Sequence, residues 1–208
     1  MRSGAPGRAV ARRVLPAAFY ARPTLRVARD LIGMVLVHET RAGTAAGAIV
    51  EVEAYIGEGD PACHAAPGPT PRNRLLYGPP GRAYVYLNYG LHCLVNAVTE
   101  PEGSPAAVLI RALEPLAGLE QMRRRRARVN GAGLRDIDLC RGPGNLACAL
   151  GITLRLNGAD LTRGPLRIED WGLAAGRRVV WTPRVGIRVG TDRLWRCLDA
   201  ASAAVSGP

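Results

Sequence analysis

Two glutamates and a tyrosine share one side of a segment that alternates as a β-strand does. In residues 48–56 a period of two places apolar side chains on one face, which we expect to point into the core: Ala48, Val50, Val52, Ala54 and Ile56. The opposite face then carries Ile49, Glu51, Glu53 and Tyr55. Carboxylates held in this way can act as general acid or base. A solvated outer face of a sheet would show the same pattern, so the strand alone leaves both interpretations open.

Tyrosines also alternate along a predicted β-hairpin. Tyr84 and Tyr86 share one face of its first strand, a turn follows at residues 88–90, and residues 91–98 return as the second strand. Tyr89 therefore lies at the tip, where a large aromatic side chain is poorly buried by the hairpin itself. It can act as a wedge between base pairs of a nucleic acid, or it can pack against another loop of the protein.

Two polar residues interrupt otherwise apolar strands. Asn96 lies within the return strand of the hairpin, where a buried amide needs a hydrogen-bond partner or a ligand. Arg111 ends an apolar strand over residues 106–111. A buried arginine needs an anionic partner, and Glu51 and Glu53 are the candidates.

A long loop over residues 57–81 is rich in glycine and proline and contains His64. Loops of this length in a small domain tend to be functional or disordered. Arg72 and Arg74 flank an asparagine, a combination that suits phosphate oxygens. An ordinary basic surface loop would have the same composition.

The charge balance points to a polyanionic partner. The chain of 208 residues carries a formal net charge of +11, which is typical of nucleic-acid-binding proteins and would also suit a ribosome-bound or membrane-surface protein. No apolar run approaches the roughly 18 to 20 residues that span a bilayer, and no sustained apolar segment follows the N-terminal arginines. We therefore expect no membrane association and a cytoplasmic location.

Cysteine and histidine spacing gives no metal signature. The five cysteines contain no C-x-x-C pair, and the three histidines have no paired spacing. We expect free thiols, no structural metal and no cofactor.

The other periodic segments predict a mixture of helices and strands. They are a helix over residues 24–33 capped by Thr24 and ended by Gly33, a strand over 34–38, a helix over 116–128 begun by Pro115, a helix opened by the turn at 142–146, and short strands over 179–181 and 185–189. The sequence thus predicts a mixed α/β (α+β) domain over residues 14–200. A disordered basic arm over residues 1–13 would precede it, and a flexible tail over residues 201–208 would follow.

Taken together, these features resemble the alkyladenine (3-methyladenine) DNA glycosylase family. The resemblance spans about residues 15–190 and rests on several motifs in register: residues 49–55, His64, residues 70–74, Tyr84 to Tyr86, Tyr89 with Gly90, Asn96, residues 109–115 and, more weakly, residues 142–143 and 183–186. It implies a single domain with a curved, mostly antiparallel sheet surrounded by helices, and a protruding hairpin that enters the DNA minor groove.

The resemblance also implies the activity and the site. The protein would be a monomeric, monofunctional glycosylase of base excision repair that acts on double-stranded DNA containing alkylated or deaminated purines. Glu53 would be the general base for the attacking water, with Arg111 beside it. The flipped base would stack between Tyr55 on one face and His64 and Tyr86 on the other. Asn96 would line the pocket floor and exclude the amino group of guanine, and Tyr89 would fill the gap in the duplex.

Two rival interpretations belong to other classes of protein. A noncatalytic nucleic-acid-binding module could keep the scaffold, but it would not need both Glu53 and Arg111. A ribosome-associated basic protein would leave the Glu–Tyr face of residues 51–55 unexplained.

The chain contains no lysine, since its 28 basic residues are all arginine. A lysine Schiff base with the sugar is therefore impossible. We expect any excision to leave an intact abasic site, and borohydride to trap no covalent protein–DNA adduct. An adduct, or strand nicking without added alkali, would contradict this prediction.

Overall fold

The computed structural model describes residues 12–130 and 133–207. Its strands are β1 (Arg13–Val14), β2 (Val35–Thr40), β3 (Gly43–Ile56), β4 (Ala83–Asn88), β5 (His92–Val98), β6 (Ala106–Ala117), β7 (Leu166–Asp170), β8 (Val179–Thr182) and β9 (Arg196–Asp199). Its α-helices are α1 (Ala17–Tyr20), α2 (Thr24–Leu31), α3 (Leu119–Asn130) and α4 (Pro143–Leu150). Short 3₁₀ turns lie at η1 (Arg74–Tyr77), η2 (Asp136–Asp138) and η3 (Leu154–Leu156).

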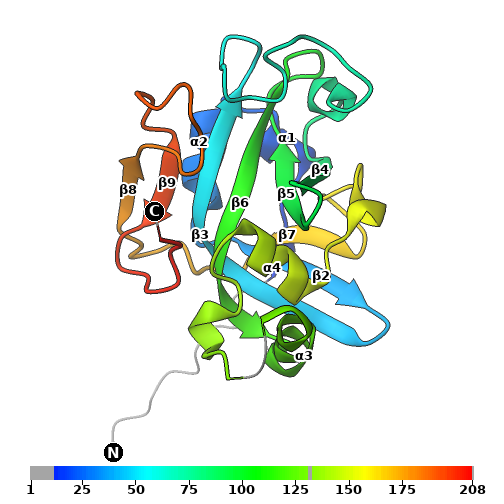
Figure 1. The fold of residues 1–208 in the computed structure, drawn as a ribbon, viewed down its shortest axis with the longest axis vertical. Helices are drawn as coiled ribbons and strands as arrows, with labels where there is room; N and C mark the ends of the chain where they lie inside the picture. The colour runs from blue at the N-terminus through cyan, green and yellow to red at the C-terminus, as the bar shows by residue number, and fades with distance from the viewer. Residues whose placement is uncertain (1–11, 131–132, 208) are drawn as a thin grey trace, which may run out of the picture.

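The strands form one open, antiparallel sheet in the order β1-β7-β2-β3-β6-β5-β4. Strand β3 is long enough to pair with β2 along its first half and with β9 near Glu53, and β8 extends the sheet beyond β9. In Figure 1, β3 and β6 run side by side through the middle of the molecule, with the β4–β5 hairpin on one side and β8–β9 on the other. The predicted α+β class with a mostly antiparallel sheet is confirmed.

Strand β3 contains a bulge that changes the faces of its side chains. Its pairing with β6 shifts register on both sides of Glu51. Ile49 packs in the main core, whereas Val50 packs in a smaller cluster with Ala204. The predicted faces of Ile49 and Val50 are therefore wrong, because strict alternation does not continue through a bulge.

Beyond the bulge the predicted alternation holds. Val52 and Ala54 join the main core, and Glu53 and Tyr55 project to the other face of the sheet. The hairpin follows the same rule, since Val85 packs in the main core while its neighbours Tyr84 and Tyr86 lie on the opposite side. The core thus fixes one face of the central strands and leaves their polar and aromatic side chains together on the other.

Helix α2 forms as predicted, but it is capped differently. Thr24 is its first helical residue and makes no side-chain cap. Instead the Glu100 carboxylate accepts hydrogen bonds from the backbone N–H and the hydroxyl of Thr24, at 2.6 and 2.7 Å. A carboxylate there also complements the positive end of the helix dipole. This contact joins residues 76 positions apart, so local sequence could not reveal it.

The predicted helix over residues 116–128 begins later than expected. Strand β6 continues through Pro115 to Ala117, and α3 begins at Leu119 after Gly118. Gly118 has φ +76°, and a Cβ atom there would lie 2.4 Å from the carbonyl oxygen of Thr44. Only glycine permits this close approach, so the start of the helix is set by packing against β3 rather than by the proline.

The arginine run of α3 is largely engaged within the protein. Arg125 and Arg126 donate to the carbonyl groups of Ala149 and Leu139, each at 2.9 Å, and Arg123 pairs with Glu120 and Asp136. These contacts hold α3 against α4 and against residues 136–139, so the arginines serve the fold rather than phosphate contact.

The chain ends and one predicted strand also differ from expectation. Most of the expected basic arm, residues 1–11, lies outside the described residues, and Arg13 pairs within the sheet as part of β1. The expected flexible tail over residues 201–208 includes Ala204, which is fully buried. Residues 185–189 form an irregular loop rather than a strand.

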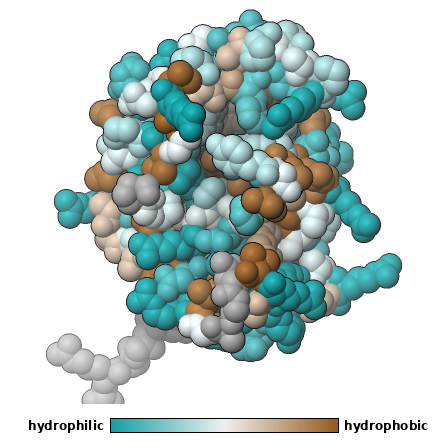
Figure 2. All heavy atoms as spheres, in the orientation of Figure 1, coloured by the Kyte–Doolittle hydropathy of each residue, from teal (hydrophilic) through white to brown (hydrophobic). Residues whose placement is uncertain are grey.

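The described surface facing the viewer in Figure 2 is mostly hydrophilic, with hydrophobic side chains in small separate groups. No helix among the described residues is both long and apolar enough to cross a membrane.

Candidate active site

A cavity of about 400 Å³ lies beside the hairpin, bounded also by the loop after β3 and the loop after β8. This volume falls in the usual range for small-molecule sites. Its lining residues include Tyr55, His64, Tyr84, Tyr86, Arg111 and Val185. The polar and aromatic face of the central strands therefore opens into a recess rather than onto a flat surface.

His64 and Tyr86 form an aromatic wall of the cavity. Their ring centroids are 4.5 Å apart at an interplanar angle of 67°, and His64 Nδ1 lies 2.9 Å from the hydroxyl of Tyr84. Burial lowers the pKa of His64, and the nearby positive charge of Arg72 lowers it further. The imidazole is therefore neutral at pH 7. Burial also raises the pKa of Tyr86 to about 12, so this wall carries no charge.

Tyr55 provides a second aromatic surface and is held from two directions. Its hydroxyl donates to Glu53 Oε2 at 2.8 Å, and the guanidinium carbon of Arg184 lies 4.7 Å from its ring centroid. Burial and the neighbouring Glu53 charge raise the pKa of the Tyr55 hydroxyl. The hydroxyl therefore stays protonated and available as a donor to the carboxylate.

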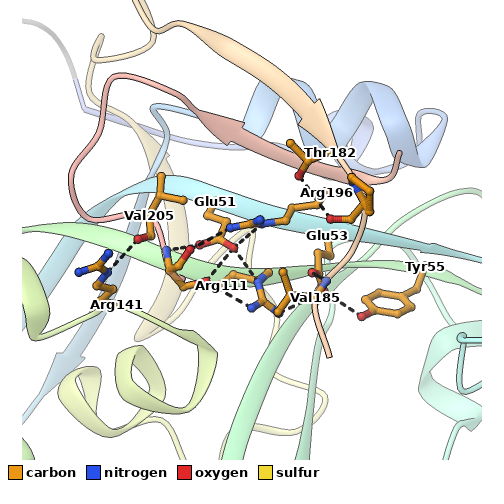
Figure 3. Close-up of polar contacts among 11 residues, drawn as sticks. Glu51, Glu53, Tyr55, Arg111, Arg141, Thr182, Val185, Arg196 and Val205 are labelled. Atoms are coloured by element: carbon orange, nitrogen blue, oxygen red, sulfur yellow. Dashed lines mark hydrogen bonds and ion pairs between the residues drawn. The ribbon is translucent and has the colours of Figure 1, made fainter. Parts of the chain in front are cut away.

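Glu53 is fully buried and lies directly behind the cavity wall. Its Oε1 accepts the backbone N–H of Val185 at 2.7 Å, and its Oε2 accepts the Tyr55 hydroxyl and faces Arg111 Nη1 at 3.2 Å. All three partners line the cavity. Figure 3 shows Glu53 between Arg111, Val185 and Tyr55. A carboxylate in this position can act on a group that binds in the recess.

Glu51 forms the other half of the charge cluster. Its Oε1 accepts from Arg111 Nε at 2.8 Å and from Arg196 Nε at 2.7 Å, and its Oε2 accepts from the backbone N–H of Ser206 at 2.7 Å. Two carboxylates and two guanidinium groups therefore balance in a buried region. The sequence prediction that Arg111 pairs with one of the two glutamates is confirmed, and it pairs with both.

Arg111 remains a cation in this environment. Burial alone would lower the pKa of its guanidinium, but Glu53, Glu51 and the hydrogen bond to Glu51 raise the pKa overall. Arg111 lies in the middle of β6 rather than at the predicted strand end, and the pairing explains how an arginine can lie there, since a buried charge needs both a counter-charge and hydrogen bonds.

Similarity to known proteins identifies the family. A family model described as Methylpurine-DNA glycosylase (MPG) matches residues 18–203. The chain belongs to the methylpurine-DNA glycosylase family. It is accordingly a DNA glycosylase, an enzyme of DNA repair that hydrolyses N-glycosidic bonds. The noncatalytic and ribosome-associated alternatives are thereby excluded.

The sequences of several known proteins align with most of this chain. One from Methanocella arvoryzae is 50% identical over 197 residues, covering 93% of this chain and 96% of that protein. Others come from Rubrobacter xylanophilus, with 53% identity over 81% of this chain and 85% of the relative, and from Burkholderia lata, with 46% identity over 100% and 98%. Each carries the name "Putative 3-methyladenine DNA glycosylase".

Five of the predicted site residues lie close together in the structure. Tyr55, His64, Tyr86 and Arg111 line one cavity, and Glu53 lies behind it. Four of them cluster because β3, β4 and β6 belong to one sheet and present the same face, and the loop after β3 brings His64 to them.

The other predicted residues lie around this centre. Asn96 is buried but is not among the lining residues, and its Nδ2 donates to the Tyr84 carbonyl at 3.0 Å. Tyr89 lines the cavity from the hairpin tip and is 88% exposed. Arg72 and Arg74 are exposed, and Arg72 is close enough to influence His64.

Four residues that support the site were not predicted from the sequence: Asp60, Arg184, Arg196 and Ser206. All four act through long-range pairing, for which periodicity gives no signal. For Arg184 the available signal was its place in the motif over residues 183–186, and Arg196 and Ser206 lie beyond the matched motifs.

The described residues were also searched for groups of side chains that could bind a metal ion. Within residues 12–130 and 133–207, no three His, Cys, Asp or Glu side chains form a group that could hold a metal ion.

A buried ion pair joins the two loops that border the cavity. Arg184 Nη1 and Nη2 contact the two Asp60 carboxylate oxygens at 2.5 and 2.8 Å, and both side chains are fully buried. Asp60 also accepts the backbone N–H of Ala62, two residues before His64. Burial alone would raise the pKa of Asp60, but the hydrogen bond and charge of Arg184 lower it overall. The pair thus fixes the loop of His64 relative to that of Val185.

We expect Asp60→Asn to reduce the free energy of unfolding by about 3 to 5 kcal/mol, because it leaves the Arg184 charge buried without a counter-charge. Urea denaturation measures the change. The matched control is Asp30→Asn, which breaks the half-exposed Arg22–Asp30 pair and should cost no more than about 1 kcal/mol. Equal losses of unfolding free energy in the two variants would show that the buried pair stabilises the fold no more than the exposed one.

Proposed function

We propose that this glycosylase is monofunctional, binds damaged purines flipped out of double-stranded DNA, and hydrolyses the bond to the sugar with a water that Glu53 activates. One observation carries the proposal. The Glu53 carboxylate is held by Tyr55, Arg111 and Val185 directly behind an aromatic-walled cavity. The enzyme would work as a cytoplasmic monomer whose partner is DNA, without a cofactor.

The walls of the cavity suit alkylated purines. An N-alkylated purine is cationic, and stacking on tyrosine rings adds a cation–π attraction of about 0.5 to 2 kcal/mol. His64 and Tyr86 are uncharged at pH 7, so they can stack without repelling a cationic base. Tyr55 would stack on the opposite face. The names of the relatives point to 3-methyladenine as one substrate, and planar neutral lesions such as hypoxanthine and ethenoadenine would use the same walls.

The hydrogen bonds of Glu53 leave a place for the water. A carboxylate offers about four acceptor positions. Among the described residues, Tyr55 donates to Oε2, which Arg111 also faces as an ion pair, and the Val185 N–H donates to Oε1. We assign the other position at Oε1 to the attacking water. A proton of this water would pass to Glu53 while a lone pair of the water oxygen attacks the sugar carbon. The bond between the sugar and the base would break, and the base would leave with the bonding electrons.

Glu53 would also stabilise the transition state electrostatically. Positive charge develops on the sugar as the base departs, and a fixed carboxylate nearby opposes it without reorganisation. Arg111 holds that carboxylate in place, because its guanidinium contacts both Glu53 and Glu51. A cationic alkylated base is already a good leaving group, so a base-activated water can suffice for it.

The hairpin tip and Asn96 would act on the DNA and on selectivity. We propose that Tyr89 enters the minor groove and fills the gap left by the flipped nucleotide, while Arg72 and Arg74 contact the backbone. Asn96 would exclude the guanine amino group. Because its pairing partner Leu109 lines the cavity, it would act from behind the floor.

Glu53→Gln tests the mechanism. The amide is nearly isosteric but cannot accept the proton of the water, so single-turnover excision of hypoxanthine from a duplex should fall by at least about 10², the effect expected for loss of a general base. Affinity for the same duplex should be retained, which also shows that the pocket still forms.

The matched control is Glu39→Gln, an exposed glutamate on β2 that pairs with Arg167 at the surface. It should excise at the wild-type rate. A near-wild-type rate for Glu53→Gln would overturn the proposed role of this carboxylate.

Tyr89→Gly tests the wedge. Tyr89 has φ +49°, a conformation that glycine adopts without strain, so the variant should unfold at nearly the wild-type temperature. Its affinity for damaged duplex DNA should fall at least about tenfold, because nothing then offsets the few kcal/mol of unstacking. Tyr89→Phe should bind almost normally, since it keeps the ring.

A second control for the wedge is Val129→Ala, which removes an exposed apolar side chain from α3. It should bind damaged DNA as the wild type does. Unchanged binding by Tyr89→Gly would identify Tyr89 as an ordinary surface aromatic.

A further inference from the structure

The segment after β9 places Ser206 in the charge cluster beside Glu53. Its backbone N–H donates to Glu51 Oε2 at 2.7 Å, and its carbonyl accepts from Arg196 Nη2 at 2.9 Å. Its hydroxyl donates to Glu51 Oε1 at 2.8 Å. Ser206 is thus bonded through both its backbone and its side chain to groups that surround Arg111.

The Ser206 hydroxyl also accepts from Arg111. Arg111 Nη2 donates to Ser206 Oγ at 3.3 Å. A serine hydroxyl has one proton to donate and two lone pairs to accept with, so donation to Glu51 and acceptance from Arg111 are compatible. The hydroxyl therefore bridges an anion and a cation of the cluster.

These contacts fix the orientation of the Arg111 guanidinium. Nε is bonded to Glu51 and Nη2 to Ser206, while Nη1 faces Glu53 at 3.2 Å. A planar guanidinium held at two of its three nitrogens has little freedom at the third. Glu51 and Ser206 thus determine which edge of the Arg111 guanidinium faces Glu53.

The segment that carries Ser206 is itself anchored. Ala204 is fully buried against Val50 and Ala112, and Arg141 Nε donates to the Val205 carbonyl at 2.9 Å. Figure 3 shows the Arg141–Val205 contact next to the Glu51–Arg111–Arg196 group. A residue on such a segment can position its neighbours, whereas one on a loose tail could not.

We propose that Ser206 is a positioning residue for base excision, whose hydroxyl holds Arg111 in the orientation that supports Glu53. This inference rests on the proposed roles of Glu53 and Arg111. Ser206 is not among the residues that line the cavity, and its hydroxyl acts through its bonds to Arg111 and Glu51. Loss of its hydroxyl should slow the chemical step and leave DNA binding unchanged.

Ser206→Ala, Ser206→Thr and Ser202→Ala test the proposal. Single-turnover excision of hypoxanthine by Ser206→Ala should fall about tenfold, as expected for loss of a hydrogen bond to a charged group, with affinity for the damaged duplex within about twofold of wild type. Ser206→Thr keeps the hydroxyl and should restore most of the rate. Ser202→Ala removes a hydroxyl from the same segment, where it bonds Glu114 at 2.6 Å, and should excise normally.

Thermal unfolding of each variant identifies any general loss of stability. The proposal is overturned if Ser206→Ala excises at the wild-type rate, if Ser206→Thr is as slow as Ser206→Ala, or if Ser202→Ala is slowed equally. Glu53→Gln, assayed in parallel, separates the two hypotheses. A near-wild-type Glu53→Gln defeats the proposed mechanism itself, whereas an inactive Glu53→Gln beside a fully active Ser206→Ala defeats only the role of Ser206.

Discussion

The pairing of two buried carboxylates with two guanidinium groups is the constraint on which the site depends. Removing each ion from water costs several kcal/mol, and only close counter-charges with complete hydrogen bonding offset that cost. Glu51 and Glu53 lie on one strand, so their partners must come from elsewhere: Arg111 from β6 and Arg196 from β9. A protein that buries this cluster must therefore bring β6 and β9 against the same part of β3.

The sheet meets this requirement through the length of β3 and its bulge. The first half of β3 pairs with β2, and the second half has an edge free for β9. The bulge beside Glu51 lets Val50 face the C-terminal segment while Val52 remains in the core. A regular strand could not place Val50 and Glu51 on the same side, because adjacent residues point to opposite faces. The irregularity thus makes room for the segment that completes the cluster.

Local sequence predicted the parts of the site that follow from alternation. The Glu53–Tyr55 face, the aromatic hairpin and the pairing of Arg111 all depend on period-two patterns or on the cost of an unpaired buried charge, and the structure contains each of them. The bulge, the Asp60–Arg184 pair and the packing of Ala204 depend on contacts between residues far apart in the chain. The small, unpatterned residues near the C-terminus resembled a loose tail because their partners are distant.

The two glutamates differ in their polar partners. Glu51 accepts from two arginines and twice from Ser206, and these groups all belong to the buried charge cluster. Glu53 accepts hydrogen bonds from Tyr55 and from the backbone N–H of Val185 and forms an ion pair with Arg111, and all three partners line the cavity. Identical side chains two residues apart are thus separated into an anchor and a candidate base. Glu51 holds Arg111, Arg196 and Ser206 within the fold, whereas every partner of Glu53, the proposed base, borders the cavity.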